Sequence, residues 1–182
     1  MDNNDVLRRV RYILDFDDER MIATFKAADC RVSRARISNW LKKDDDPAFK
    51  HIDDKHLAIF LNGLINRIRG KREGEQPAPE DRLDNNIIFR KLKIAFDLRD
   101  DEILEIVELA GFTLGKSELS AFFRSRGHKN YRACKDQILR NFLLGLQAKY
   151  RDEVMKRVKA EEKKKRQGVK LASGVMVRRK EG

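Results

Sequence analysis

The chain has 182 residues, of which 39% are charged and 41% hydrophobic, and its formal net charge at pH 7 is +11. No apolar run approaches the roughly 20 residues that span a bilayer, and the first ten residues lack the apolar segment of a secretory signal. These features argue against membrane-spanning and secreted proteins. We expect a cytoplasmic, all-α protein built from short amphipathic helices, with a polyanionic partner.

The sequence repeats itself with a shift of about 82 residues and no insertion. Residues 3–69 align with residues 85–151. Identical pairs include Asn3/Asn85, Asn4/Asn86, Arg8/Arg90, Asp15/Asp97, Asp54/Asp136, Phe60/Phe142 and Gly63/Gly145. Apolar character is kept at most other inward positions, so we predict a tandem duplication of one module of about four helices, packed as one body.

The first two helices of each copy follow polar starts. An Asn pair, at residues 3–4 or 85–86, precedes the first apolar stripe, and its side chains are predicted to cap free N–H groups. The second helix follows acidic residues at 17–19 or 100–102, which suit the positive end of a helix.

The third helix is short, at about residues 33–42 in the first copy, and the fourth is longer. The fourth spans residues 53–69 or 135–151 and carries a shared Phe-Leu-x-Gly-Leu motif. Gly63 and Gly145 lie inside it at a cost of about 1 kcal/mol each relative to Ala. Close approach by another helix would explain them.

The predicted organisation is a first repeat at residues 1–70, a linker at 71–84, a second repeat at 85–151 and a basic tail at 152–182. The linker holds two of the three prolines. Eleven Lys or Arg and three Glu lie between Lys156 and Gly182, so about +8 of the net charge of +11 falls in this part of the tail. The tail is predicted to begin as a helix and to continue as a flexible segment.

The doubled Asn pair, the two Phe-Leu-x-Gly-Leu helices and the stretch KSELSAFFRSRGHKNYRACKDQILRNFL at residues 116–143 resemble the YehS-like family of bacterial cytosolic proteins of unknown function. The resemblance covers about residues 1–151. It implies a duplicated helical domain and a bacterial source, and it implies no biochemical activity. The residues after 151 extend beyond what the family core requires, so any role for them rests on composition.

Residues 27–43, AADCRVSRARISNWLKK, are similar to the second half of a helix-turn-helix. Its outward face would present residue types that bond phosphates and base edges: Arg34, Arg36, Asn39, Lys42 and Lys43. However, Arg31 stands where the turn usually has glycine, and the second copy has Glu118 and Ala121 in the places of Arg36 and Asn39. Plain core packing with a solvated basic face is the alternative, and we favour it over DNA reading.

The loop at residues 124–132, RSRGHKNYR, combines several cations with an aromatic residue, which suits contact with a polyanion. The first copy has KKDDDPAFK at residues 42–50, with Phe49 opposite Tyr131, so the aromatic is interpreted as a structural plug in both copies. The predicted nucleic-acid contacts are Lys116, Arg124, Arg126, His128, Lys129, Tyr131 and Arg132, with Lys163, Lys164, Lys165, Arg166, Arg178 and Arg179 in the tail.

No catalytic, cofactor-binding or metal-binding residues are predicted. His51, His56 and His128 are scattered, and no phosphate-binding loop or nucleophile motif is present in the sequence. Cys30 and Cys134 are interpreted as buried small apolar residues, not as a disulfide, redox or metal pair. We therefore expect a protein that is not an enzyme and that needs no cofactor.

The leading hypothesis is a nucleic-acid-binding protein that contacts RNA or a ribonucleoprotein such as the ribosome, in preference to specific DNA, through the tail and the second-copy loop. The alternative is a protein-interaction adaptor in which the groove between the repeats receives a partner helix. The alternative predicts a contiguous exposed apolar patch between the copies. No membrane partner is expected.

Overall fold

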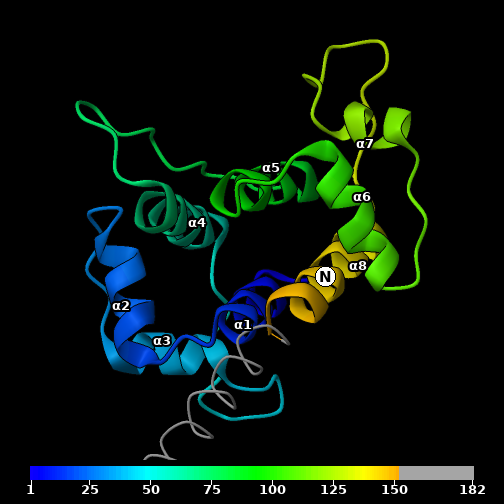
Figure 1. Ribbon diagram of the computed structural model, residues 1–182. Helices are drawn as coiled ribbons and strands as arrows, with labels where there is room; N and C mark the ends of the chain where they lie inside the picture. Colours follow the sequence, from blue (N-terminus) through cyan, green and yellow to red (C-terminus); the bar gives the residue numbers. More distant parts are fainter. Residues whose placement is uncertain (152–182) are drawn as a thin grey trace, which may run out of the picture.

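The computed structural model describes residues 1–151, and within them it contains eight α-helices followed by one π-helical turn (Figure 1). The first copy contains α1 (Asn3–Leu14), α2 (Asp18–Lys26), α3 (Arg34–Leu41) and α4 (Asp54–Arg69). The second copy contains α5 (Asn85–Ala95), α6 (Asp100–Leu109), α7 (Lys116–Phe122), α8 (Asp136–Leu146) and η1 (Gln147–Arg151). The predicted all-α tandem fold is confirmed. The predictions for residues 152–182, including the six tail contacts, lie outside the described residues.

Aspartates begin several of these helices. Asp2 and Asp84 are the N-cap residues of α1 and α5, and their carboxylates accept the N–H groups of Asp5 and Ile87. The prediction that the Asn pair caps these helices was therefore wrong. An aspartate directly before each pair takes the cap because its charge also suits the positive helix end, and the Asn side chains are left free to bond elsewhere.

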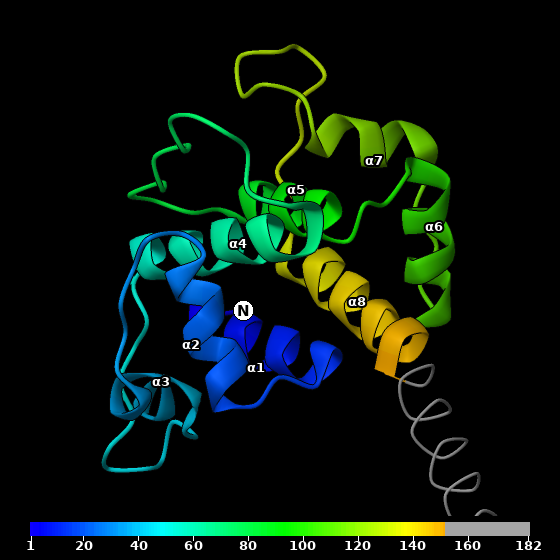
Figure 2. The ribbon, with the colours of Figure 1, turned by 60° about the vertical axis from the view of Figure 1, so that its left-hand side comes forward.

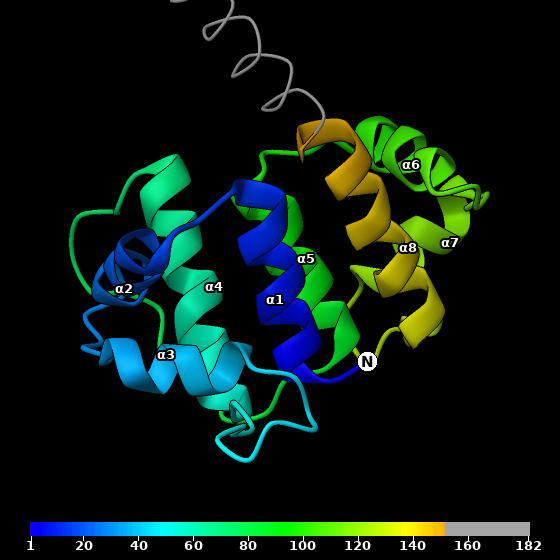
Figure 3. The ribbon, with the colours of Figure 1, turned by 90° about the horizontal axis from the view of Figure 1, so that it is seen from below.

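The two copies pack as one body around four central helices. The helix α4 lies against α5, and α1 lies against α8 and η1. Exchanging the copies converts the first pair into the second, so the body has approximate two-fold symmetry. Figure 3 shows these four helices side by side and running in one direction, with α2 and α3 on one flank and α6 and α7 on the other.

Two ion pairs join the copies at the C-terminal ends of the central helices. Arg69 pairs with Asp97, and Arg151 pairs with Asp15. Arg69 and Arg151 occupy the same position in their copies, as do Asp15 and Asp97, so each copy supplies one cation and one acid. Both aspartates adopt a left-handed backbone with φ of 53°.

The N-terminal ends of the same helices are joined in an equivalent way. The Asp54 carboxylate at the start of α4 accepts the backbone N–H of Leu83 at 2.9 Å. The Asp136 carboxylate at the start of α8 accepts from the amino group of Met1, which corresponds in the repeat to Leu83. The symmetry therefore extends from packing to individual polar contacts at both ends.

The glycine inside each fourth helix marks a close crossing, as predicted. A Cβ added to Gly63 would lie 1.8 Å from the carbonyl oxygen of Thr24 in α2, and one added to Gly145 would lie 1.8 Å from that of Ile106 in α6. Thr24 and Ile106 are equivalent positions. Only a residue without a side chain permits a backbone approach of this kind.

The segment predicted as a linker, residues 71–84, contains no helix and packs back on the body. Lys71 pairs with Asp29 at 2.8 Å, and Glu80 pairs with Lys91 of α5 at 2.9 Å. These contacts hold the linker at both of its ends. In the part of the chain that the structure describes, no helix has the length and apolar character needed to cross a membrane.

Candidate nucleic-acid interface

The loop between α7 and α8 is anchored by the second Asn of the pair in α5. The Asn86 amide donates to the carbonyl oxygens of Phe122 at 2.9 Å and Arg132 at 2.8 Å, and its oxygen accepts the N–H of Cys134 at 2.9 Å. In the first copy Asn4 bonds the equivalent backbone groups of Trp40, Lys50 and Ile52. Each buried asparagine thus binds both ends of its loop to the first helix of its copy through hydrogen bonds.

Within the two loops the backbone hydrogen bonds are also the same. The N–H groups of His128 and Tyr131 donate to Ser125 and His128, both at 2.9 Å, and that of Arg132 donates to Ala121 at 3.2 Å. The first-copy bonds are Asp46 to Lys43, Phe49 to Asp46 and Lys50 to Asn39, at the equivalent positions. The two loops therefore share one backbone scaffold and differ in their side chains.

The second-copy loop borders a hollow of about 530 Å³ that we call the copy-two hollow. It is lined by Gly115, Ser117, Glu118, Ala121, Arg124, Lys129, Asn130, Tyr131 and Arg132. Four predicted contact residues therefore come together here. Figure 2 shows the loop, in yellow-green beside α7, extending away from the body.

Three cations line the copy-two hollow, and one of them, Arg124, lies 3.4 Å from Nδ1 of His128. Among the described residues, Arg124, Lys129 and Arg132 form no ion pair, and Lys129 and Arg132 are exposed. Lys116, another predicted contact, is exposed at the start of α7 but does not line the hollow. The lining of the hollow thus carries three cations and one acid, Glu118, and this net positive charge on a concave surface favours the binding of an anion.

Arg126 is positioned differently from its neighbours. Its guanidinium pairs with Asp84, and the nearby Asp84 and Tyr131 raise the pKa of Arg126. Burial by itself would raise the pKa of Asp84, but the hydrogen bonds from Arg126 and from the Ile87 N–H hold that pKa below its usual value. Arg126 thus ties the second-copy loop to the start of α5 and is better described as a positioning residue than as a free cation.

His128 also has a structural contact. Its Nδ1 accepts the backbone N–H of Asn130 at 3.0 Å, as the carboxylate of Asp46 accepts that of Ala48 at 2.8 Å in the first copy. His128 therefore substitutes for an acid in the turn and keeps the same loop shape without a negative charge.

The second predicted patch, on α3 and directly after it, is partly occupied by internal contacts. The Arg36 guanidinium lies 5.0 Å from the centre of the Trp40 ring, and Lys42 pairs with Asp46 at 3.4 Å. Asn39 is partly buried, whereas Arg34 and Lys43 are exposed and have no ion pair among the described residues. Residues 44–46 add three acids beside this face, so it is less favourable to a polyanion than the second-copy loop.

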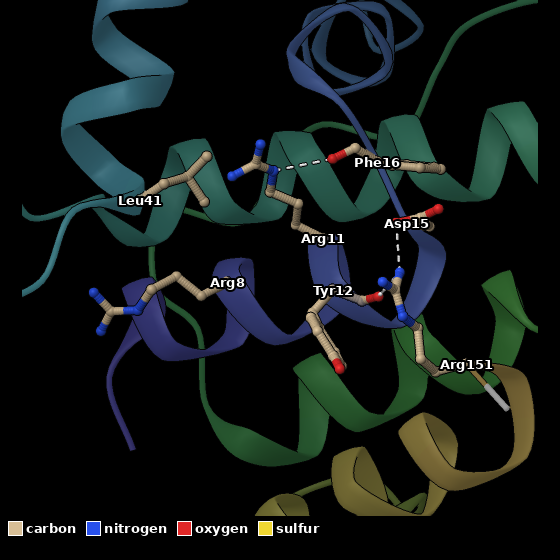
Figure 4. A pocket seen from close by; sticks show the side chains of 7 residues that line it. All are labelled: Arg8, Arg11, Tyr12, Asp15, Phe16, Leu41 and Arg151. Atoms are coloured by element: carbon tan, nitrogen blue, oxygen red, sulfur yellow. Dashed lines mark hydrogen bonds and ion pairs between the residues drawn. The ribbon is translucent and has the colours of Figure 1, made fainter. Parts of the chain in front are cut away.

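A third hollow, lined by the first copy and by Arg151 of the second, was not among the sites predicted from the sequence. Figure 4 shows it, with a volume of about 280 Å³ and a lining of Arg8, Arg11, Tyr12, Asp15, Phe16, Leu41 and Arg151. All three arginines are paired: Arg8 with Asp5 and Asp44, Arg11 with Asp18, and Arg151 with Asp15. Beyond the identity of Arg8 with Arg90 and of Asp15 with Asp97, the sequence carries no signal for this hollow. Since all three arginines are paired, this hollow is less favourable to an anion than the copy-two hollow, and its Arg151–Asp15 pair joins the copies.

The two cysteines differ in exposure. Cys134 is buried, with 5% of its surface exposed, and burial raises the pKa of its thiol to about 12. Cys30 is only partly buried, so the prediction of a buried residue was wrong for it. It directly follows Asp29, whose left-handed backbone turns the chain away from the end of α2. Both thiols are free.

We expect Cys134 to resist alkylation in the native protein, because its thiol is buried and almost fully protonated at neutral pH. Cys30 is expected to react at least about a hundredfold faster. Mass spectrometry after timed treatment with iodoacetamide measures both rates, and denatured protein is the control in which the two cysteines should react similarly. Equal rates in the native protein would contradict the burial of Cys134.

The comparisons with known proteins agree with the duplicated architecture. Residues 3–70 and residues 85–152 each match one family, described as protein of unknown function (DUF1456). The chain therefore belongs to this family of duplicated helical proteins. It is 42% identical over 149 residues to the uncharacterized protein YehS of Escherichia coli (strain K12), a match that covers 81% of this chain and 95% of that relative. No solved structure matches the chain.

Proposed function

We propose that this chain is a non-catalytic RNA-binding protein that contacts RNA, free or in a ribonucleoprotein, through the copy-two hollow and the basic tail. One observation carries the proposal. Two loops with the same backbone hydrogen bonds differ in charge: residues 42–50 hold three Lys and three Asp, whereas residues 124–132 hold four Lys or Arg and no acid. Because both loops have the same backbone structure, folding does not require this difference in charge. The cations of the second-copy loop are therefore the residues to which we assign the function.

Two further features favour single-stranded RNA over specific DNA. Tyr131 lines the copy-two hollow, where a base that is not held in a duplex can stack on its ring. On the face of α3 that would read the major groove, Arg36 contacts Trp40 and Lys42 pairs with Asp46, and three acids follow at residues 44–46. The tail adds eleven cations whose contribution to phosphate binding is independent of sequence.

The proposal predicts salt-sensitive RNA binding that depends on the second-copy loop. Replacing Arg124, Lys129 and Arg132 together by Ala should weaken binding to a labelled single strand of about twelve nucleotides. It should also make the plot of log affinity against log salt less steep by about 2, since each lost phosphate contact reduces the magnitude of the slope by about 0.7. Fluorescence anisotropy between about 50 and 200 mM salt measures both quantities.

A matched variant has Lys42, Lys43 and Lys50 replaced by Ala, which removes the same charge from the first-copy loop. It should lower the slope by less than the second-copy variant does. A chain that ends after Arg151 should bind more weakly than the full chain. Equal effects of the two loop variants, or binding that does not depend on salt, would contradict the proposal.

The adaptor function is a second candidate, supported by exposed apolar side chains near the ends of the central helices. Tyr12, Ile68 and Ile94 are 50%, 46% and 44% exposed, on α1, α4 and α5 respectively. Figure 3 shows the C-terminal ends of these helices on the same side of the body. Isolation of partners from cell lysate with and without nuclease separates the two functions. A protein partner that survives nuclease supports the adaptor, and partners lost with nuclease support RNA binding.

A further inference from the structure

The copy-two hollow contains one acidic side chain that phosphate binding does not explain. Of the nine described residues that line it, Glu118 is the one acid. Glu118 is partly buried on α7 and forms no ion pair among the described residues. The first copy has Arg36 at the equivalent position. The hollow thus combines three unpaired cations with one unpaired carboxylate.

A carboxylate beside a phosphate site reduces affinity for phosphate by like-charge repulsion, unless it receives hydrogen bonds from the same ligand. Phosphates offer no donor at neutral pH, so the donors must come from the sugar or the base. Guanine presents two adjacent donors, N1–H and the N2 amine, which match the two oxygens of a carboxylate. Adenine and cytosine place an acceptor nitrogen beside their amine, and uracil places carbonyl oxygens on both sides of N3–H.

We propose that the copy-two hollow is a guanine-selective site for single-stranded RNA, an inference that rests on the proposed function. Glu118 accepts hydrogen bonds from N1–H and the N2 amine of the base, and the ring of Tyr131 provides the surface for stacking. Arg124, Lys129 and Arg132 bind the adjoining phosphates. The volume of about 530 Å³ lies within the range of roughly 300–1,000 Å³ usual for sites that bind small organic groups.

The test measures binding of the full chain to three labelled RNAs of about twelve nucleotides. The first contains uridine alone, the second has one central guanosine, and the third has inosine in place of that guanosine, which removes only the N2 amine. We expect the guanosine RNA to bind about tenfold more tightly than the uridine RNA, with inosine in between.

The variant Glu118→Gln should lose most of this preference, and it should bind the uridine RNA at least as tightly as the wild type because a negative charge is gone. Glu108→Gln, at an exposed position of α6, is the matched control and should keep the preference. Wild-type binding to uridine and guanosine RNA with equal affinity would overturn the guanine site and leave the proposed RNA binding intact. A guanosine preference that persists in Glu118→Gln would also overturn it. Failure to bind any of the three RNAs would overturn the proposed function together with this site.

Discussion

Replacing Gly145 by Ala is expected to destabilise the protein by about 3 kcal/mol. The added Cβ would lie 1.8 Å from the carbonyl oxygen of Ile106, and because that oxygen belongs to the backbone of α6, one of the two helices must shift. Alanine is intrinsically better than glycine in a helix by about 1 kcal/mol, and this gain is not enough to offset the clash. Urea unfolding monitored by circular dichroism measures the change.

Gly127→Ala is the matched control, because an added Cβ at Gly127 meets nothing within 4 Å. It should change the free energy of unfolding by less than about 0.5 kcal/mol. Gly63→Ala should behave like Gly145→Ala, since its Cβ would meet Thr24 at the same distance of 1.8 Å. An unchanged free energy of unfolding in Gly145→Ala would show that α6 and α8 do not cross as closely as described.

Replacing Asn86 by Ala is expected to cost about 3 kcal/mol and also to weaken RNA binding. The variant removes the hydrogen-bond partner of three backbone groups, those of Phe122, Arg132 and Cys134. Each buried backbone group left without a partner costs about 1–3 kcal/mol of stability. Because two of these bonds hold the start and end of the second-copy loop, its cations should lose their fixed arrangement. Thermal unfolding and RNA anisotropy measure the two effects.

The duplication provides the control for this experiment. Asn4→Ala removes the same three bonds from the first copy and should destabilise the protein to a similar extent. Measured well below both melting temperatures, it should leave RNA affinity nearly unchanged. An equal loss of affinity in the two variants would mean that the effect comes from general destabilisation and not from the second-copy loop.

Much of the fold could be predicted because the repeat allows equivalent positions in the two copies to be compared. A position that stays apolar, or stays glycine, in both copies is constrained by packing, and Gly63 and Gly145 were recognised as close crossings in this way. The N-caps were assigned one residue too late. Asn and Asp are both good caps, and only the structure shows that the Asn amides instead hold the loops.

The candidate site could be predicted in part. The excess of cations at residues 124–132 is visible in the sequence, and four of the residues named there line the copy-two hollow. The roles of Arg126 and His128 were not predictable, because they depend on Asp84 and Asn130 being within hydrogen-bonding reach. Glu118 was recognised as a difference between the copies, but its place among the cations of the hollow follows only from how α7 packs beside the loop.

The most direct test of the account is to exchange the loops, replacing residues 124–132 by the sequence of residues 42–50 in the full chain. Both loops make the same backbone hydrogen bonds, so the exchanged protein should fold, while four cations are replaced by three cations and three acids. We predict weaker RNA binding, because Lys129 is lost and three acids are added while positions 124 and 132 stay cationic, and the steepness of the plot of log affinity against log salt should fall by at least about 0.7. A folded exchange variant that binds RNA with the affinity and salt dependence of the wild type would contradict the account.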